Sequence, residues 1–454
     1  MVARITIAGA GHGGLVAGIL LARNGFDVTL FEQNSRDALG YDWHDDFYLE
    51  SFDKAGLPRP PSSDFTRRKN ISFHSPGLTH VLSTNVPENQ LEIQMDRKVL
   101  YARLLAHAEE AGVKLNFNTH VSGPLVKGHP AIVCGLVVDG KEIEADLVID
   151  AAGLSSPVRR GLPADYHITH DVVAPDVFYT YRAYYQLLPG KARDLSMFHV
   201  YFFFEGLRGI AWFRVVDEHA DILFGQVNPL SPDLVDKLLH AMRREEPSIG
   251  EKRTRGGQYN TIPIRRSLSR FVGDGYAAVG DAACMTVPLN GSGIHNAFVA
   301  GKLLADTVKE ASTVTSTRPF TVRELWPYQA RYFKEIGTRM VGIDCLRRYL
   351  LSLPASDLDF MFAKRLITEA EITAASAGGQ IKMGIKDLMG KFARGFTRLP
   401  FLLSLKKAVD QMKKAMAIAS RIPSTYDPSA INNWEIALEE SMSSLIRPVP
   451  NTIP

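Results

Sequence analysis

The chain of 454 residues is 45% hydrophobic and 22% charged, and its formal net charge is +3. This composition is typical of a soluble globular protein, and the length favours more than one domain. So small a net charge over this length argues against general affinity for nucleic acid.

The cysteines and the hydropathy pattern bear on where the protein works. The three cysteines, Cys134, Cys284 and Cys345, lie far apart without metal-ligand spacing, which argues against a disulfide framework or a zinc site. No apolar run approaches the length of a membrane span, and the first strand follows Met1 too closely to leave room for a cleavable leader. We therefore expect a cytoplasmic protein, with contact to a membrane surface left open.

The first thirty-two residues carry a dinucleotide-binding pattern. A short β-rich run from Arg4 ends at a glycine-rich turn and is followed by an apolar helix, and a second strand ends at Glu32. The G-x-G-x-x-G spacing is supplied by Gly9, Gly11 and Gly14, with Gly13 inside it. Such glycines make the turn, admit a pyrophosphate and let the helix pack on the strand, while an acid about twenty residues on can accept ribose hydroxyls. An ordinary glycine-rich strand–helix turn is the alternative.

The next segments are less specific. Residues 38–47 are dense in aromatic and ionisable groups, so Asp42 is a candidate proton donor, although a polar loop around one buried tryptophan fits equally well. A helix is predicted from Arg97 to Gly112, and Arg97 at its start could meet a phosphate or only solvent. Strands are predicted for residues 70–74, 80–83 and 113–121, and a buried strand ends at Asp150, before Gly153.

The middle third alternates strand-like runs with one helix near residues 234–242. We expect an antiparallel sheet that covers a substrate, with Trp212 in a cavity wall. A further buried strand then runs into Gly280 and Asp281, and a second glycine-rich helix start follows at Pro288, Gly291, Gly293 and Ile294. His295 and Cys284 are candidates for a reactive role, but a helix-capping histidine and an inert buried thiol explain them as well.

The C-terminal third is predicted to be helical. Residues 401–420 alternate apolar positions with lysines, as in a basic helix that lies on an anionic membrane. Packing on the protein itself, with the lysines in water, is the alternative. A short helix and a tail are expected at the end.

Three motifs taken together resemble the FAD-dependent reductases and monooxygenases of the glutathione-reductase-like superfamily. They are the N-terminal glycine turn with Glu32, the segment from Asp150 to Arg160, and the run Gly280-Asp281-Ala282-Ala283 followed by Pro288, Gly291 and Gly293. The resemblance covers residues 1–160 and 270–310. It extends to geranylgeranyl reductase-type flavoproteins through the Pro-Leu-x-Gly-x-Gly-Ile segment and the helical C-terminal region, while only Trp212 matches their tryptophan signature.

This resemblance implies an α/β protein with a Rossmann-like, glutathione-reductase-like FAD-binding domain in residues 1–165 and 265–320. An antiparallel-sheet substrate domain in 166–264, with part of 40–95, and a helical region in 321–454 would complete it. FAD would be held at its ADP half by the first motif and Glu32, with Arg97 at the pyrophosphate and Val121 at the adenine. The remaining contacts would come from Gly153, Asp281, Pro288, Gly291, Gly293 and Ile294.

The resemblance favours reduction of a carbon–carbon double bond in an apolar, isoprenoid or lipid substrate by hydride from the flavin. A monooxygenase that hydroxylates or epoxidises such a substrate is the second hypothesis, and a membrane-peripheral protein with FAD as a structural ligand is the third. Aromatic hydroxylases of this superfamily carry an aspartate where this chain has Ala152, and in them that residue is associated with NAD(P)H as well as with flavin. The electron donor, whether NAD(P)H, ferredoxin or a reductase, therefore stays open.

Overall fold

The computed structural model describes residues 2–88, 91–188, 196–313, 320–376, 378, 390–391 and 393–443. Its first layer is a six-stranded sheet in the order β18-β19-β12-β1-β2-β8. The strands are β1 (Arg4–Ala8), β2 (Asp27–Phe31), β8 (Lys114–Asn116), β12 (Leu147–Asp150), β18 (Val272–Gly273) and β19 (Tyr276–Ala278). All neighbours pair in parallel except β18 and β19. The α/β prediction is thus confirmed.

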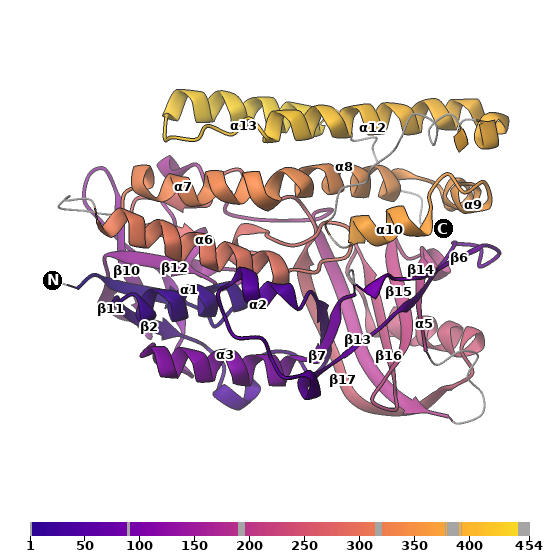
Figure 1. Ribbon diagram of the computed structural model, residues 1–454, viewed down its shortest axis with the longest axis horizontal. Coiled ribbons are helices and arrows are strands. Elements are labelled where there is room, and N and C mark those ends of the chain that lie inside the picture. Colours follow the sequence, from indigo (N-terminus) through magenta and orange to yellow (C-terminus); the bar gives the residue numbers. More distant parts are fainter. Residues whose placement is uncertain are drawn as a thin grey trace.

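Helices cover this sheet. Helix α1 (His12–Arg23) packs against both α3 (Arg97–Ala111) and α6 (Ile294–Ser312), as Figure 1 shows. A three-stranded sheet of β9 (Val121–Lys127), β10 (Ile132–Val138) and β11 (Lys141–Glu144) contacts β12 through β10. Short α4 (Pro157–Arg160) follows the strand that ends at Asp150.

Three strand ends coincide at one edge of the six-stranded sheet. Ala8 of β1 is level with Asp150 of β12, and Asp150 is level with Ala278 of β19. Because these strands are parallel, the loops that follow them leave the sheet on the same side. The three sequence motifs, separated by more than a hundred residues, are therefore brought to one edge.

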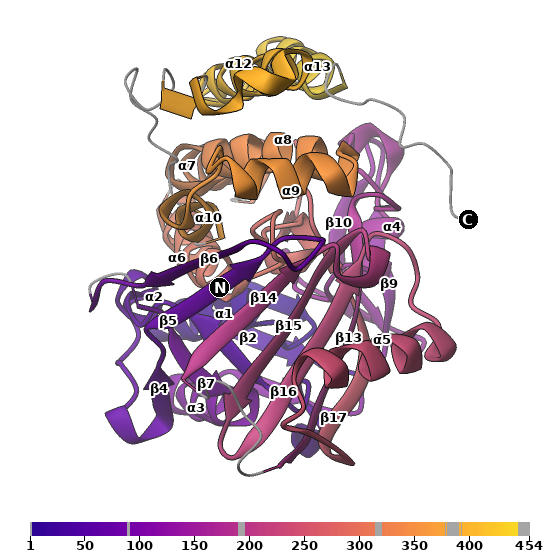
Figure 2. The same ribbon diagram turned by 90° about the vertical axis from the view of Figure 1, so that its right-hand side faces the viewer.

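The second large sheet has seven strands in the order β17-β13-β16-β15-β14-β5-β6. They are β5 (Asn70–His74), β6 (Val81–Asn85), β13 (Val177–Leu187), β14 (Met197–Phe202), β15 (Gly209–Val216), β16 (His219–Gln226) and β17 (Ile249–Pro263). Alternate side chains divide between its faces: Tyr181, Phe213 and Phe224 pack with α5 (Pro232–Glu245), whereas Phe178, Trp212 and Leu223 line a cavity. Figure 2 shows α5 against this sheet.

This sheet corrects one expectation, because it is mixed and not wholly antiparallel. Strand β5 pairs in parallel with β14, while the other pairs are antiparallel. A hairpin cannot produce a parallel pair, so the partner strand comes from a distant part of the chain. Here it comes from the segment between β2 and α3, which we call the excursion. Within the same excursion, β3 (His44–Phe47), α2 (Glu50–Lys54), β4 (Phe65–Arg67) and β7 (Ile93–Asp96) lie nearby, and β3, β7 and β4 form a small antiparallel sheet.

The C-terminal part is helical, as expected. It comprises α7 (Val322–Tyr332), α8 (Thr338–Ser352), α9 (Ala355–Ala363), α10 (Glu369–Ser376), α12 (Leu399–Ala419) and α13 (Pro428–Ser443). In Figure 1, α12 and α13 form an outer layer over α7 and α8. The apolar side of α12 packs on α8, where Met412 and Met416 lie against Gly342. Contact of 401–420 with a membrane thus stays a prediction, and none of the described helices is long and apolar enough to cross a bilayer.

Candidate active site

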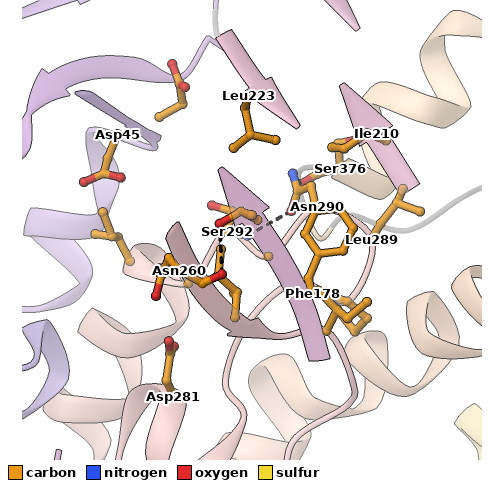
Figure 3. A pocket seen from close by; sticks show the side chains of 18 of the residues that line it. Asp45, Phe178, Ile210, Leu223, Asn260, Asp281, Leu289, Asn290, Ser292 and Ser376 are labelled. Atoms are coloured by element: carbon orange, nitrogen blue, oxygen red, sulfur yellow. Dashed lines mark hydrogen bonds between the residues drawn. The ribbon is translucent and has the colours of Figure 1, made fainter. Parts of the chain in front are cut away.

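A cavity of about 570 Å³ lies between the six-stranded sheet, the seven-stranded sheet and the helices α8–α10. Its volume falls within the roughly 300–1,000 Å³ of ligand-binding cavities. Figure 3 shows Asp45 and Asp281 apart from a group that includes Phe178, Ile210 and Leu289. We call the part with the two carboxylates the polar end; the other end is mainly apolar, although Asn290 and Ser376 also line it.

Most of the predicted cofactor contacts meet at the polar end. The lining includes Gly11, Gly13, Arg97, Gly153, Asp281, Pro288, Gly291, Gly293 and Ile294. Helices α1 and α6 both begin here, at His12 and Ile294, with glycine before each first residue. The unpaired N–H groups of two helix N-termini thus face the cavity, which suits the phosphates and carbonyl oxygens of a dinucleotide.

Gly9 and Gly14 do not line the cavity but permit the close packing behind it. Gly9 has φ +85°, and a Cβ there would lie 2.7 Å from the carbonyl oxygen of Ala151. A Cβ on Gly14 would lie 2.5 Å from that of Ala151. A Cβ on Gly11 would also meet the Ala151 oxygen, at 2.7 Å, so the protein's own packing already requires this glycine.

Glu32 and Val121 also lie outside the cavity lining. The Glu32 carboxylate accepts hydrogen bonds from the backbone N–H of Ala10 at 2.9 Å and from the backbone and side chain of Asn34, each at 2.8 Å. These donors hold the carboxylate at the end of β2, beside the turn that opens α1. Val121 begins β9 and is buried. Their contacts with ribose and adenine stay predictions.

Asp281 presents its carboxylate to the cavity. It accepts no side-chain hydrogen bond from any described residue, and burial raises its pKa to about 6, with Arg97 opposing. An acceptor left without a protein partner in a cavity is suited to ligand hydroxyls. The loop that carries it is held by buried Arg159, which donates to the carbonyl of Ala282 at 2.7 Å.

Arg97 is already paired within the protein. Its Nε and one terminal nitrogen contact the two oxygens of Asp45 at 2.5 and 2.7 Å, and it lies over the rings of Tyr41 and Trp43. Burial alone would raise the pKa of Asp45, but the guanidinium of Arg97 outweighs this effect and the pKa is lowered. Arg97 therefore brings a neutralised pair to the cavity, and a pyrophosphate contact stays a prediction.

The four reactive candidates separate in the structure. Trp212 lines the cavity, with its indole nitrogen buried and without a partner among the described residues. His295 instead bonds Ser51 at 2.9 Å, and Asp42 pairs with Arg255 at 2.8 Å. Cys284 is fully buried, and burial raises the pKa of its thiol to about 11. His295, Asp42 and Cys284 do not line the cavity. The structure therefore gives none of the three direct access to a ligand in it.

Sequence reasoning missed a network of charges on the cavity face of the seven-stranded sheet. Buried Asp221 accepts from Arg182 at 2.6 and 2.9 Å and from Arg214 at 2.5 Å. Arg214 also contacts Asp46 at 2.5 Å, and Arg68 lies 3.4 Å from the same carboxylate. The sequence contained a signal for this network. Arg182 is four residues after Phe178 and Arg214 is two residues after Trp212, so each arginine lies on the same face of its strand as a residue that lines the cavity.

Beyond the polar end the cavity wall is mainly apolar, although charged side chains such as Arg68, Glu92 and Arg347 also line it. Its wall is formed by side chains of the seven-stranded sheet, of the segment after Pro288 and of α8–α9, among them Phe73, Phe178, Phe198, Val200, Phe202, Ile210, Leu223, Ile262, Leu289, Leu350, Leu351 and Leu358. Such a wall gains free energy by covering hydrocarbon at about 25 cal/mol per Å². An extended apolar ligand could therefore lie against it with one end near the polar part.

The polar end fits FAD on its own chemistry. It offers helix N-termini for phosphates and, for hydroxyls, the carboxylate of Asp281, which has no hydrogen-bond partner among the described residues. Gly153 has open space where its Cβ would be. Gly291, with φ +76°, turns the backbone ahead of α6, and a Cβ there would lie 2.9 Å from Ile262. No part of this donor set conflicts with a flavin dinucleotide.

Comparisons with known proteins agree with this geometry. The model of the FAD binding domain family matches residues 2–314. The chain is 24% identical over 446 residues to the digeranylgeranylglycerophospholipid reductase of Sulfolobus acidocaldarius, with 95% of each chain covered. Among solved structures, a geranylgeranyl bacteriochlorophyll reductase-like protein of Thermoplasma acidophilum is similar with TM-score 0.71 and 16% identity, over 90% of this chain and 99% of that one.

The flavin-dependent halogenase CmlS shares the fold with TM-score 0.58 and 17% identity, over 98% of this chain and 78% of that one. The family match covers well over half of the sequence and includes all three motifs. The predicted family resemblance and the FAD cofactor are confirmed. The chain belongs to the FAD binding domain family and is an FAD-dependent oxidoreductase.

Proposed function

We propose that the protein is an FAD-dependent reductase that saturates carbon–carbon double bonds of an isoprenoid lipid. The observation that carries this proposal is the cavity itself, in which a cofactor end and a long apolar wall share one space. The curated relative named above supports the substrate class. FAD, when reduced, supplies hydride, and the protein supplies orientation, water exclusion and a proton.

Different residues would bind the cofactor and the substrate. The N-termini of α1 and α6 and Asp281 would hold the flavin dinucleotide, with Glu32, Arg97 and Val121 toward its ADP half. Apolar side chains such as Phe178 and Leu289 would align the hydrocarbon and keep water out. We also propose the glutathione-reductase-like form of the Rossmann fold, with the domain limits stated from the sequence.

The experiment is anaerobic. Purified protein loaded with FAD is reduced with dithionite, mixed with geranylgeranyl diphosphate or a digeranylgeranyl glycerophospholipid, and followed by the return of oxidised-flavin absorbance. We expect reoxidation together with products heavier by two hydrogens per saturated bond. No reoxidation with either substrate would contradict the proposal.

Two control arms separate the competing functions. In air, a product that gains an oxygen atom would show a monooxygenase. A bound flavin that dithionite cannot reduce would show that FAD is a structural ligand. Adding NADPH or reduced ferredoxin in place of dithionite identifies the electron donor.

A further inference from the structure

The carboxylates that line the cavity differ in whether the protein has paired them. Asp45 is paired with Arg97, and Asp46 is paired with Arg214 and Arg68. Asp281 stands at the cofactor end. Glu92 also lines the cavity, yet no described residue donates a hydrogen bond to it or forms an ion pair with it. Among the described residues, Glu92 is thus a cavity carboxyl without a protein partner.

Contacts on neighbouring elements relate Glu92 to the start of α6. Phe47 of β3 pairs with Ile93 of β7, so Tyr48 and Glu92, one step beyond, leave the same end of this strand pair. The Tyr48 ring meets that of His295 edge-on at 5.8 Å, and His295 is the second residue of α6. Glu92 is therefore linked through Tyr48 to the start of α6, where Ile294 lines the cavity.

The surroundings of Glu92 suit a carboxyl that exchanges protons near neutrality. Burial, and then the charge of Asp46, raise its pKa to about 7, while Arg68 and Arg214 oppose this shift. Burial and then the carboxylates of Glu92 and Glu50 raise the pKa of the Tyr48 phenol, which stays protonated. The charged groups around Glu92 thus come from β3, β15 and the segment after β4.

We propose that Glu92 is the proton donor of the reduction, an inference that rests on the proposed function. Glu92 gives its carboxyl proton to one alkene carbon while the other carbon receives hydride from reduced FAD. Two C–H bonds form, the π bond breaks, and the flavin loses two electrons. The Glu92 carboxylate then regains a proton from water.

The test uses the FAD-loaded protein and the variant Glu92→Gln, which keeps the shape but cannot supply a carboxyl proton. Turnover of the wild type should fall as the pH rises through about 7, because the acid must be protonated. In the variant we expect kcat lower by about 10²–10⁴-fold and no such pH dependence. Binding of FAD and its reduction by dithionite should not change.

A second readout does not depend on turnover. Infrared difference spectra of wild type minus Glu92→Gln should show a carboxyl C=O band that disappears as the pH is raised through about 7. Glu92→Asp should keep the pH dependence with a smaller loss of kcat. Glu88→Gln, an exposed carboxylate paired with Lys69 on the same segment, is the matched control and should behave as wild type.

The outcomes separate this inference from the proposed function. If the wild type reduces the lipid and Glu92→Gln does so at the same rate with the same pH profile, Glu92 is not the donor. Absence of a titrating carboxyl band would overturn the inference in the same way. If the wild type itself fails to reoxidise with either lipid, the proposed function fails instead.

Discussion

Asp281 holds a carboxylate in a cavity where burial disfavours its charge and raises its pKa to about 6. The folded pKa lies above the unfolded one, so ionisation penalises the apoprotein fully above about pH 6, and the penalty fades as the pH falls toward 4. Asp281→Asn should therefore raise the apoprotein Tm at pH 8 by roughly 1–3 °C and leave it unchanged near pH 4. The same variant should bind FAD about 10–100-fold more weakly, since a charged acceptor is lost.

Scanning calorimetry of the apoprotein and FAD titration check the two halves of this prediction. Asp42→Asn, outside the cavity and paired with Arg255, is the comparison for the FAD titration. An apoprotein that loses stability at pH 8 on the Asp281 change would show that the carboxylate has a protein partner.

Asp221 shows the opposite electrostatics. Burial alone would raise its pKa, but Arg182 and Arg214 hold the pKa of this carboxyl well below its usual range. Its stabilising contribution is present above the unfolded pKa and is lost only as the pH falls below about 4. Asp221→Asn should cost about 3–5 kcal/mol at pH 7, because two buried guanidiniums lose their counter-charge.

Denaturant unfolding at pH 7 and in acid measures this cost, and the gap between variant and wild type should narrow in acid. Glu218→Gln, exposed at the turn that precedes Asp221, serves as the control. A variant as stable as wild type at pH 7 would mean that Asp46 alone balances both Arg182 and Arg214.

Helices α1 and α6 touch through glycine. A Cβ on Gly301 would lie 2.6 Å from the carbonyl oxygen of Gly13, and a Cβ on Gly13 would lie 2.9 Å from that of Ala297. Because backbone atoms cannot yield as a side chain does, Gly301→Ala should move the helices apart and cost about 1–3 kcal/mol. FAD affinity should fall with it, since both helix starts face the cofactor end of the cavity.

Thermal unfolding and FAD titration of Gly301→Ala test this packing. Gly123→Ala is the matched control, because the nearest atom to its added Cβ is 3.9 Å away. A Gly301 variant that keeps the FAD affinity of wild type would show that cofactor binding does not depend on the packing of α1 against α6.

The elements show how far sequence patterns reach. Helix α1, strand β12 and the alternating strands β13 to β16 were predicted because hydrophobic period and glycine spacing are local signals. The parallel pairing of β5 with β14 was not predicted, since it joins segments more than a hundred residues apart. Likewise, the motif was enough to predict Asp281 as a cofactor contact. The pairing of Arg97 with Asp45 could not be predicted, because it depends on the pairing of β3 with β7, which residue spacing does not indicate.

At the scale of the whole molecule, the C-terminal helices close the apolar end of the cavity. Leu351 at the end of α8 lines it. Leu351→Trp should shorten the space and lower kcat/KM for geranylgeranyl diphosphate about tenfold or more, with a smaller effect on geranyl diphosphate. Steady-state assays with both lengths check this, and Leu351→Met, which conserves volume, is the control. Equal losses for both substrates would place Leu351 away from the hydrocarbon end.

The level ends of β1, β12 and β19 have a consequence for biosynthesis. A nascent chain still on the ribosome that has not yet released Tyr276 possesses the first glycine turn but lacks both the Asp281 loop and the opening of α6. The FAD site that we propose is therefore complete only after synthesis has passed the midpoint of the chain.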